Sequence, residues 1–207
     1  MNAKRFFVLT LVLAAVLALG VSSAAAQAGN GTGEPVGQGN GYRGGRGGDA
    51  PRGNVNGGMA MNGGGLMLNL PPASAEELPQ DVIDLMVDGW MDEQHAYAVY
   101  QTVIAQFGEV RPFTSILNSE AQHIAAWEAL FDRYGIAVPE TPTFDVTAFA
   151  SLSGACAVGA SAEVANFDLY DSMLAAFEAY PDLQYVAQSL RDASEFSHLP
   201  AFERCAG

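Results

Sequence analysis

Four stretches of the chain repeat apolar residues at spacings of three and four, and a glutamate lies on or beside each of these apolar stripes. Residues at such spacings share one face of a helix, so each stretch predicts a helix that buries its striped face. The alternation of β-branched residues that would indicate strands is absent from this region. The region must therefore fold as packed helices that also accommodate carboxylates in or near their core.

Glycine and proline residues divide this region into helices and connections. Ser74 and Glu77 fit a capping box ahead of the first helix. Residues 136–147 are rich in proline and threonine and predict a long connection. The expected helices cover about residues 80–107, 112–134, 148–179 and 181–202. Residues 74–207 are thus expected to form an all-α domain, a four-helix bundle with a longer crossover between its second and third helices.

The N-terminus has the pattern of a secretory signal peptide over residues 1–28. Lys4 and Arg5 precede the apolar run 6–21, and small residues follow it. An uncleaved membrane anchor is the alternative, but sixteen apolar residues are short for a membrane span. We expect a secreted, periplasmic or cell-envelope protein with no stable membrane insertion after signal cleavage.

Residues 29–73 are rich in glycine and asparagine and have no apolar periodicity, which predicts a disordered, flexible tether. Arginines beside glycines in this segment are similar to RNA-binding repeats, but a solvated linker is the simpler interpretation in an exported chain. The chain has 9 Lys and Arg against 23 Asp and Glu and a net charge of −14. This balance argues against a nucleic-acid partner and favours cations.

The carboxylates on the stripes indicate a metal site, because an unpaired buried charge is costly. Four facing carboxylates would be balanced by two divalent ions. Two Glu-x-x-His pairs each follow another glutamate, at separations of 27 and 32 residues, and residues three apart share a helix face. The expected metal ligands are Glu93, Glu120, His123, Glu163, Glu195 and His198.

One glutamate from each of two helices and Glu-x-x-His from the other two resembles the ferritin-like di-iron carboxylate superfamily. The segments Asp92–Tyr100, Asn118–His123 and Ala193–Phe202 look like a branch of it, a domain of unknown function found in exported prokaryotic proteins. The resemblance covers about residues 77–205 and implies a di-metal site. Carboxylates with a minority of imidazoles favour iron, with manganese as the alternative.

Several further residues near these ligands also have expected positions or roles. Arg191 lies one helical turn before Glu195 and either supports this carboxylate as a ligand or neutralises it. Pro200 is expected to kink or end the fourth helix near the site. Asp92 and His95 lie off the stripe of their helix and are expected to face solvent. Aromatic residues at helical spacing are expected to be core side chains around the site: Tyr97, Tyr100, Trp127 and Tyr170.

The two cysteines are expected to pair. Cys156 lies seven residues before Glu163, and Cys205 lies seven residues after His198. In antiparallel helices these positions fall at the same level of the bundle, about 10 Å from the site at 1.5 Å rise per residue. An oxidising compartment would join them as a disulfide.

The site class supports binding of Fe(II) and its oxidation by O2 or peroxide, as in a ferroxidase-type oxidoreductase. The chain has no Cys-x-x-Cys pair for a rubredoxin-type electron-transfer module, which disfavours multi-turnover reduction. The alternative is a non-catalytic, metal-stabilised interaction module of the cell envelope. The sequence indicates no particular protein partner.

Overall fold

The computed structural model describes residues 69–207, and every regular element within them is helical. The predicted signal peptide and the predicted tether up to residue 68 lie outside the described residues. Among the described helices, none combines the length and the apolar character that crossing a membrane requires. The prediction of an all-α bundle is confirmed for the described part of the chain.

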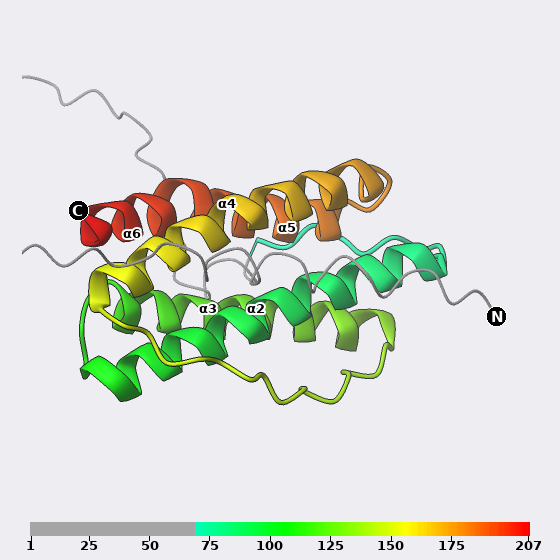
Figure 1. Ribbon diagram of the computed structural model, residues 1–207. Coiled ribbons are helices and arrows are strands. Elements are labelled where there is room, and N and C mark those ends of the chain that lie inside the picture. Colours follow the sequence, from blue (N-terminus) through cyan, green and yellow to red (C-terminus); the bar gives the residue numbers. More distant parts are fainter. Residues whose placement is uncertain (1–68) are drawn as a thin grey trace, which may run out of the picture. The chain divides into compact units, whose positions relative to one another are not determined.

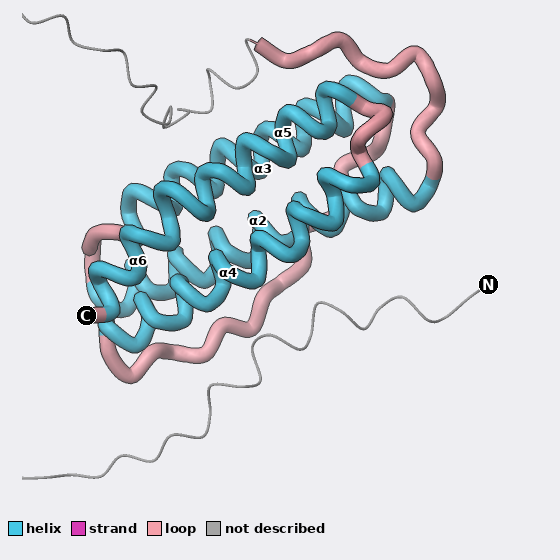
Figure 2. Tube along the Cα trace, turned by 90° about the horizontal axis from the view of Figure 1, so that it is seen from above, coloured by secondary structure: helices cyan, strands magenta, loops and turns pink. Residues whose placement is uncertain are grey.

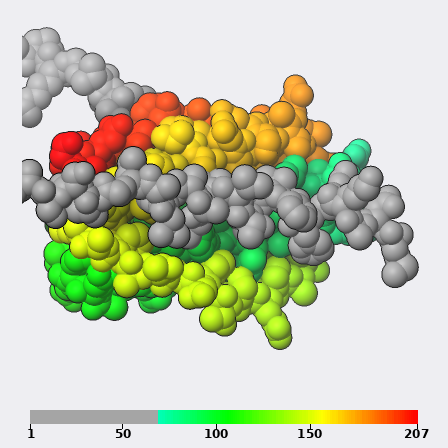
Figure 3. Space-filling model, in the orientation of Figure 1, coloured from blue at the N-terminus to red at the C-terminus, as the bar shows by residue number. Residues whose placement is uncertain are grey.

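The helices pack lengthwise as two layers (Figures 1 and 2). Helices α2 (Gln80–Phe107) and α3 (Phe113–Tyr134) form one antiparallel pair. Helix α4 (Leu152–Ala176) pairs with the interrupted C-terminal helix, which we call the last rod. That rod consists of α5 (Pro181–Ala193), a π turn η1 (Ser194–His198) and α6 (Leu199–Ala206). The connection between α3 and α4 runs along the surface in extended form (Figure 3).

The predicted capping box is wrong. Helix α2 begins only at Gln80, after an extended Pro79 whose carbonyl accepts the Val82 amide, and no side chain caps it. The Ser74 hydroxyl instead accepts the Glu76 amide within a bend. Proline directly ahead of the helix fits this start, because a proline ring disfavours the helical conformation of the residue before it.

The ends of the third and fourth helices also differ from the predicted ones. Helix α4 starts at Leu152, where the Ser151 hydroxyl accepts the Gly154 amide as an N-cap. The last rod extends to Ala206, past the expected end near Phe202. Pro200 does not end it, because the proline occupies the second position of α6, where a missing amide donor is tolerated.

Two apolar clusters fill the bundle, and a polar layer separates them. One cluster contains Trp90, Trp127 and Tyr170, and the other contains Tyr100 and Phe202. Helices α2, α3 and α4 and the π turn each place a buried polar side chain between the two clusters. The buried members of this layer are Glu93, Glu120, His123, Glu163, Asn166, Ser194 and His198.

A disulfide joins Cys156 of α4 to Cys205 of α6, with a Cα–Cα distance of 5.7 Å. The predicted pairing is confirmed. It links α4 to α6 on the side of the polar layer where Tyr100, Phe113 and Phe202 pack together. A disulfide at this place is consistent with an oxidising compartment.

Candidate metal centre

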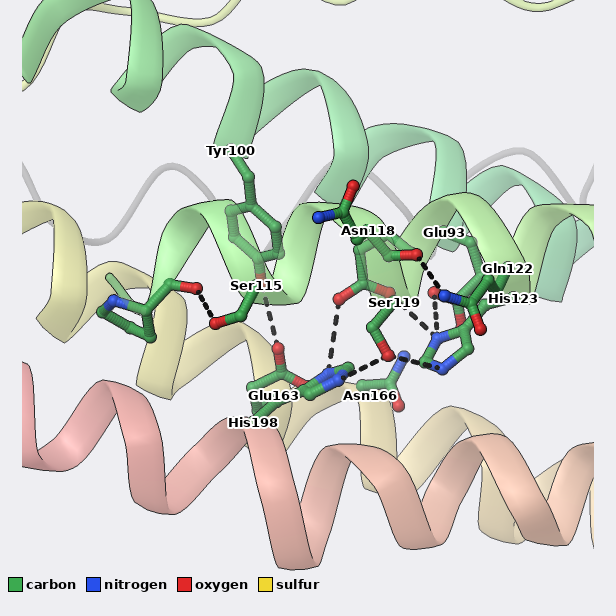
Figure 4. A network of polar contacts seen from close by, with 12 residues as sticks. Glu93, Tyr100, Ser115, Asn118, Ser119, Gln122, His123, Glu163, Asn166 and His198 are labelled. Atoms are coloured by element: carbon green, nitrogen blue, oxygen red, sulfur yellow. Dashed lines mark hydrogen bonds and ion pairs between the residues drawn. The ribbon is translucent and has the colours of Figure 1, made fainter. Parts of the chain in front are cut away.

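Five of the six expected ligands meet in the polar layer. Figure 4 labels four of them: Glu93, His123, Glu163 and His198. Glu93 comes from α2, Glu120 and His123 from α3, Glu163 from α4, and His198 from the end of the π turn. Each of these side chains is buried, and none is more than 6% exposed. The first four are buried together because each lies on the inward stripe of its own helix, and the π turn directs His198 toward them.

Each histidine lies against two carboxylates through its Nδ1 atom. His123 Nδ1 is 3.1 Å from Glu93 Oε2 and 2.9 Å from Glu120 Oε2. His198 Nδ1 is 3.3 Å from Glu120 Oε1 and 3.6 Å from Glu163 Oε2. The five side chains thus form two groups of three that share Glu120, which presents one carboxylate oxygen to each group.

These distances are compatible with cation binding. Two ligand atoms that lie about 2.1 Å from one ion, at a right angle to each other, are about 3 Å apart. In each group the candidate ligand atoms all lie within 4.8 Å of one another. His198 Nδ1 is also buried without a hydrogen-bond partner. A buried ring nitrogen that faces two carboxylate oxygens without such a partner is suited to a cation between them.

Without a cation, this cluster must hold protons. Burial and then the negative charge of Glu93 raise the pKa of Glu120 well above its usual range. Burial also tends to raise the pKa of Glu93, but the charge and hydrogen bond of His123 and further hydrogen bonds, including one from Tyr170, lower it to about 2. Burial disfavours the charged ring of His198, yet the neighbouring Glu120 and Glu163 raise its pKa. In the metal-free layer the raised pKa of Glu120 therefore favours its protonated form, beside the ionised Glu93.

Two tyrosines support the candidate ligands. The Tyr100 hydroxyl donates to Glu163 Oε1 at 3.0 Å, and the Tyr170 hydroxyl donates to Glu93 Oε1. Burial and the adjacent carboxylates raise the pKa of both phenols well above 10, so both hydroxyls remain donors. Two of the four expected core aromatics therefore also orient carboxylates of the site.

The structure does not bring Glu195 into either group. Glu195 Oε2 lies 2.6 Å from Arg191 Nη1, and its side chain is 35% exposed. Arg191 also binds Asp171, whose Oδ1 lies 2.5 Å from Arg191 Nε. The reason is the π turn at 194–198, which contains more residues per turn than an α-helix. Residues three apart no longer lie above one another there, so His198 faces the core while Glu195 points toward the surface.

The expected solvent-facing positions of Asp92 and His95 are also wrong. Asp92 is partly buried, and its Oδ2 accepts the Asn166 amide at 2.7 Å. Burial, and to a lesser extent the charge of Glu93, raises the pKa of Asp92 to about 7. His95 is partly buried against the ring of Phe144, which the α3–α4 connection places over α2. The neighbouring elements cover both residues, and neither belongs to a candidate metal group.

Ser119 also belongs to the layer, although the sequence did not predict this. The hydroxyl of Ser119 lies 3.3 Å from His123 Nε2 and 3.1 Å from His198 Nε2. The available sequence signal was its position four residues before His123, which places both on one side of α3. Nothing in the sequence indicated that His198 would reach the same hydroxyl.

No family model and no curated protein matches this chain. Among solved structures, the chain is similar to the hypothetical protein MJ0754 from Methanococcus jannaschii DSM 2661, with 21% sequence identity and a TM-score of 0.56. The match covers 67% of this chain and 85% of the other. At this level of identity the likeness supports the helical fold alone.

Proposed function

We propose that the polar layer binds two divalent cations, with Glu120 bridging them. Glu93 and His123 would hold one ion, and Glu163 and His198 the other. The observation that carries this proposal is the position of Glu120, whose two oxygens face the Nδ1 atoms of two different histidines at 2.9 and 3.3 Å. Two divalent ions would also offset the negative charge of three buried carboxylates.

Iron is the metal that we propose, with manganese as the alternative. The donor set has three carboxylates and two imidazoles, without a thiolate in either group, and such donors suit these ions better than copper or zinc. The helical layout and these ligands support membership of the ferritin-like di-iron carboxylate superfamily. Five protein ligands for two ions also leave coordination positions for water or an oxidant.

The reaction that we propose is the oxidation of Fe(II) by O2 or peroxide. Two Fe(II) ions supply two electrons, which with two protons reduce one O2 to H2O2, or one H2O2 to two waters. This chain binds the ions, orients their carboxylates through Tyr100 and Tyr170, and surrounds them with apolar clusters on both sides. The net charge of −14 would raise the local concentration of cations.

A metal-stabilised module without turnover is the second candidate. The layer draws ligands from α2, α3, α4 and the π turn, so bound ions would fasten all parts of the bundle together. In this case the protein would act at the cell envelope through surfaces outside the layer.

Export is part of the proposal for both candidate functions. It is supported by the signal-like N-terminus and the disulfide.

Anaerobic titration of the metal-free, full-length protein with Fe(II) tests the binding proposal. We expect about two ions per chain and a rise in melting temperature, because the ions bind only the folded state. Glu120→Gln keeps the side-chain volume but removes the charge of the shared ligand, and should lower the stoichiometry to one ion or fewer. The matched control is Glu203→Gln on α6, which alters an exposed glutamate and should bind as the wild type does.

Admitting oxygen to the loaded protein separates the two candidate functions. An oxidase should form ferric ion faster than the same Fe(II) in buffer, and Glu120→Gln should lose this acceleration. Binding of two ions without faster oxidation would leave the metal-stabilised module. If neither Fe(II) nor Mn(II) binds at micromolar concentration, the di-metal proposal is wrong.

A further inference from the structure

The two candidate ligand histidines share one hydroxyl on the side of their rings that faces away from the carboxylates. Their rings are stacked, with centroids 5.5 Å apart and planes at 23°. Both Nδ1 atoms face glutamate oxygens, whereas both Nε2 atoms face Ser119 Oγ, at 3.3 and 3.1 Å (Figure 4). Ser119 directly precedes Glu120 on α3, so the shared carboxylate and the shared hydroxyl come from adjacent residues.

The positions of the ring protons follow from this arrangement. A ring nitrogen that binds a cation carries no proton, so a neutral imidazole bound through Nδ1 has its proton on Nε2. Both His123 and His198 would then present an Nε2–H group to Ser119. A serine hydroxyl has two lone pairs and can accept both hydrogen bonds at once.

The opposite tautomers do not fit the same site. If both neutral rings carried their proton on Nδ1, both Nε2 atoms would be acceptors. The single hydroxyl proton of Ser119 could then reach only one of them, and the other buried nitrogen would lose a hydrogen bond. With neutral rings, Ser119 can accept from both histidines at once only in the tautomers that leave both Nδ1 atoms free to bind a metal.

We infer that Ser119 is a shared positioning residue, whose single hydroxyl fixes the ring orientation and the Nε2–H tautomer of both His123 and His198 and thereby couples the two metal positions. This inference rests on the proposed function. It assigns to one side chain an effect on both ions, so its loss should weaken the two positions together rather than one of them.

The test compares Ser119→Thr with Ser119→Val in the full-length protein. These two variants have side chains of the same shape, but only threonine keeps the hydroxyl. In a titration with Co(II), the valine variant should lose about 10- to 100-fold in affinity at both positions, the usual effect of removing a partner of a ligating histidine. The threonine variant should bind as the wild type does. Ser189→Ala on α5 is the control, since that hydroxyl bonds only its own helix at Tyr185 O.

Nuclear magnetic resonance of the Zn(II)-loaded protein, labelled with 15N at histidine, reads the tautomers directly. The chain has three histidines, and His95 outside the layer is an internal reference. In the wild type and in Ser119→Thr, both ligand rings should carry slowly exchanging Nε2–H protons. In Ser119→Val, those protons should exchange faster at both rings while the His95 signal stays unchanged.

Three results would overturn the inference. Wild-type affinity and wild-type exchange in Ser119→Val would show that the hydroxyl has no positioning role. A change at only one histidine would disprove the shared role. If the wild type itself binds none of Fe(II), Mn(II), Co(II) and Zn(II) in the layer, the proposed function fails and the inference fails with it, a result distinct from the first two.

Discussion

At the scale of single residues, the polar layer depends on donors that fix each carboxylate. Glu93 stays ionised in a buried site because hydrogen bonds and the charge of His123 oppose the effect of burial on its pKa. Tyr170 supplies one of these hydrogen bonds to Glu93 Oε1. A hydrogen bond to a charged group contributes about 1.5–3 kcal/mol to stability, about twice what a neutral pair contributes.

Tyr170→Phe therefore should destabilise the metal-free protein by about 1.5–3 kcal/mol, because an ionised carboxylate loses its donor. Urea denaturation in the presence of a chelator measures this change. Tyr185→Phe on α5, outside the layer, is the matched control and should alter the free energy of unfolding by less. Equal effects of the two substitutions would contradict the role assigned to the Tyr170 hydroxyl.

At the scale of helices, the π turn and a glycine contact determine how α4 and the last rod meet. A Cβ atom on Gly159 of α4 would lie 2.8 Å from Cδ1 of Phe202 on α6. The Phe202 ring cannot retreat easily, because it packs on Tyr100 and Phe113 at 5.2 Å between centroids. Glycine at position 159 therefore allows the close approach of these two helices.

Gly159→Ala should destabilise the protein by about 1–3 kcal/mol through overpacking, although alanine favours helices more than glycine does. Thermal or urea denaturation measures the change. Ser161→Ala, at an exposed position of the same helix, should change the free energy of unfolding little. A Gly159→Ala variant as stable as the wild type would mean that α4 and α6 can separate without cost.

The sequence predicted elements better than it predicted contacts between them. Helical periodicity placed Glu93, Glu120 and Glu163 on buried faces, because the facing direction of a regular helix follows from spacing alone. It failed for Glu195, because the π turn changes that spacing, and for Asp92, because its partner Asn166 lies on another helix. Contacts of this kind depend on packing, which a single sequence does not reveal.

At the scale of the whole molecule, the metal-free protein takes up protons when it folds. The pKa of Asp92 is raised to about 7, that of Glu120 is raised well above its usual range, and that of His198 is raised. Groups with a raised pKa in the folded state stabilise it at low pH and lose this contribution as the pH rises. The lowered pKa of Glu93 acts in the opposite sense, but only below about pH 4.5.

Chelator-treated protein should therefore become less stable as the pH rises from about 5 to 8, because the folded state holds protons on Asp92 and Glu120 that the unfolded chain has already lost. Denaturation curves across this range check the sign. Bound Mn(II) should reverse the trend, because cations replace the protons and bind better to ionised ligands. Metal-free stability that increases from pH 5 to 8 would contradict this account of the layer.

The position of metal ions in crystals of the Mn(II)-loaded protein tests the central claim most directly. Anomalous scattering locates Mn(II) without reference to any assumed ligand. We expect two peaks in the polar layer, about 3.5–4 Å apart, one on each side of the Glu120 carboxylate. A single peak, or peaks only at exposed acidic residues, would contradict the claim that Glu120 bridges two ions between His123 and His198.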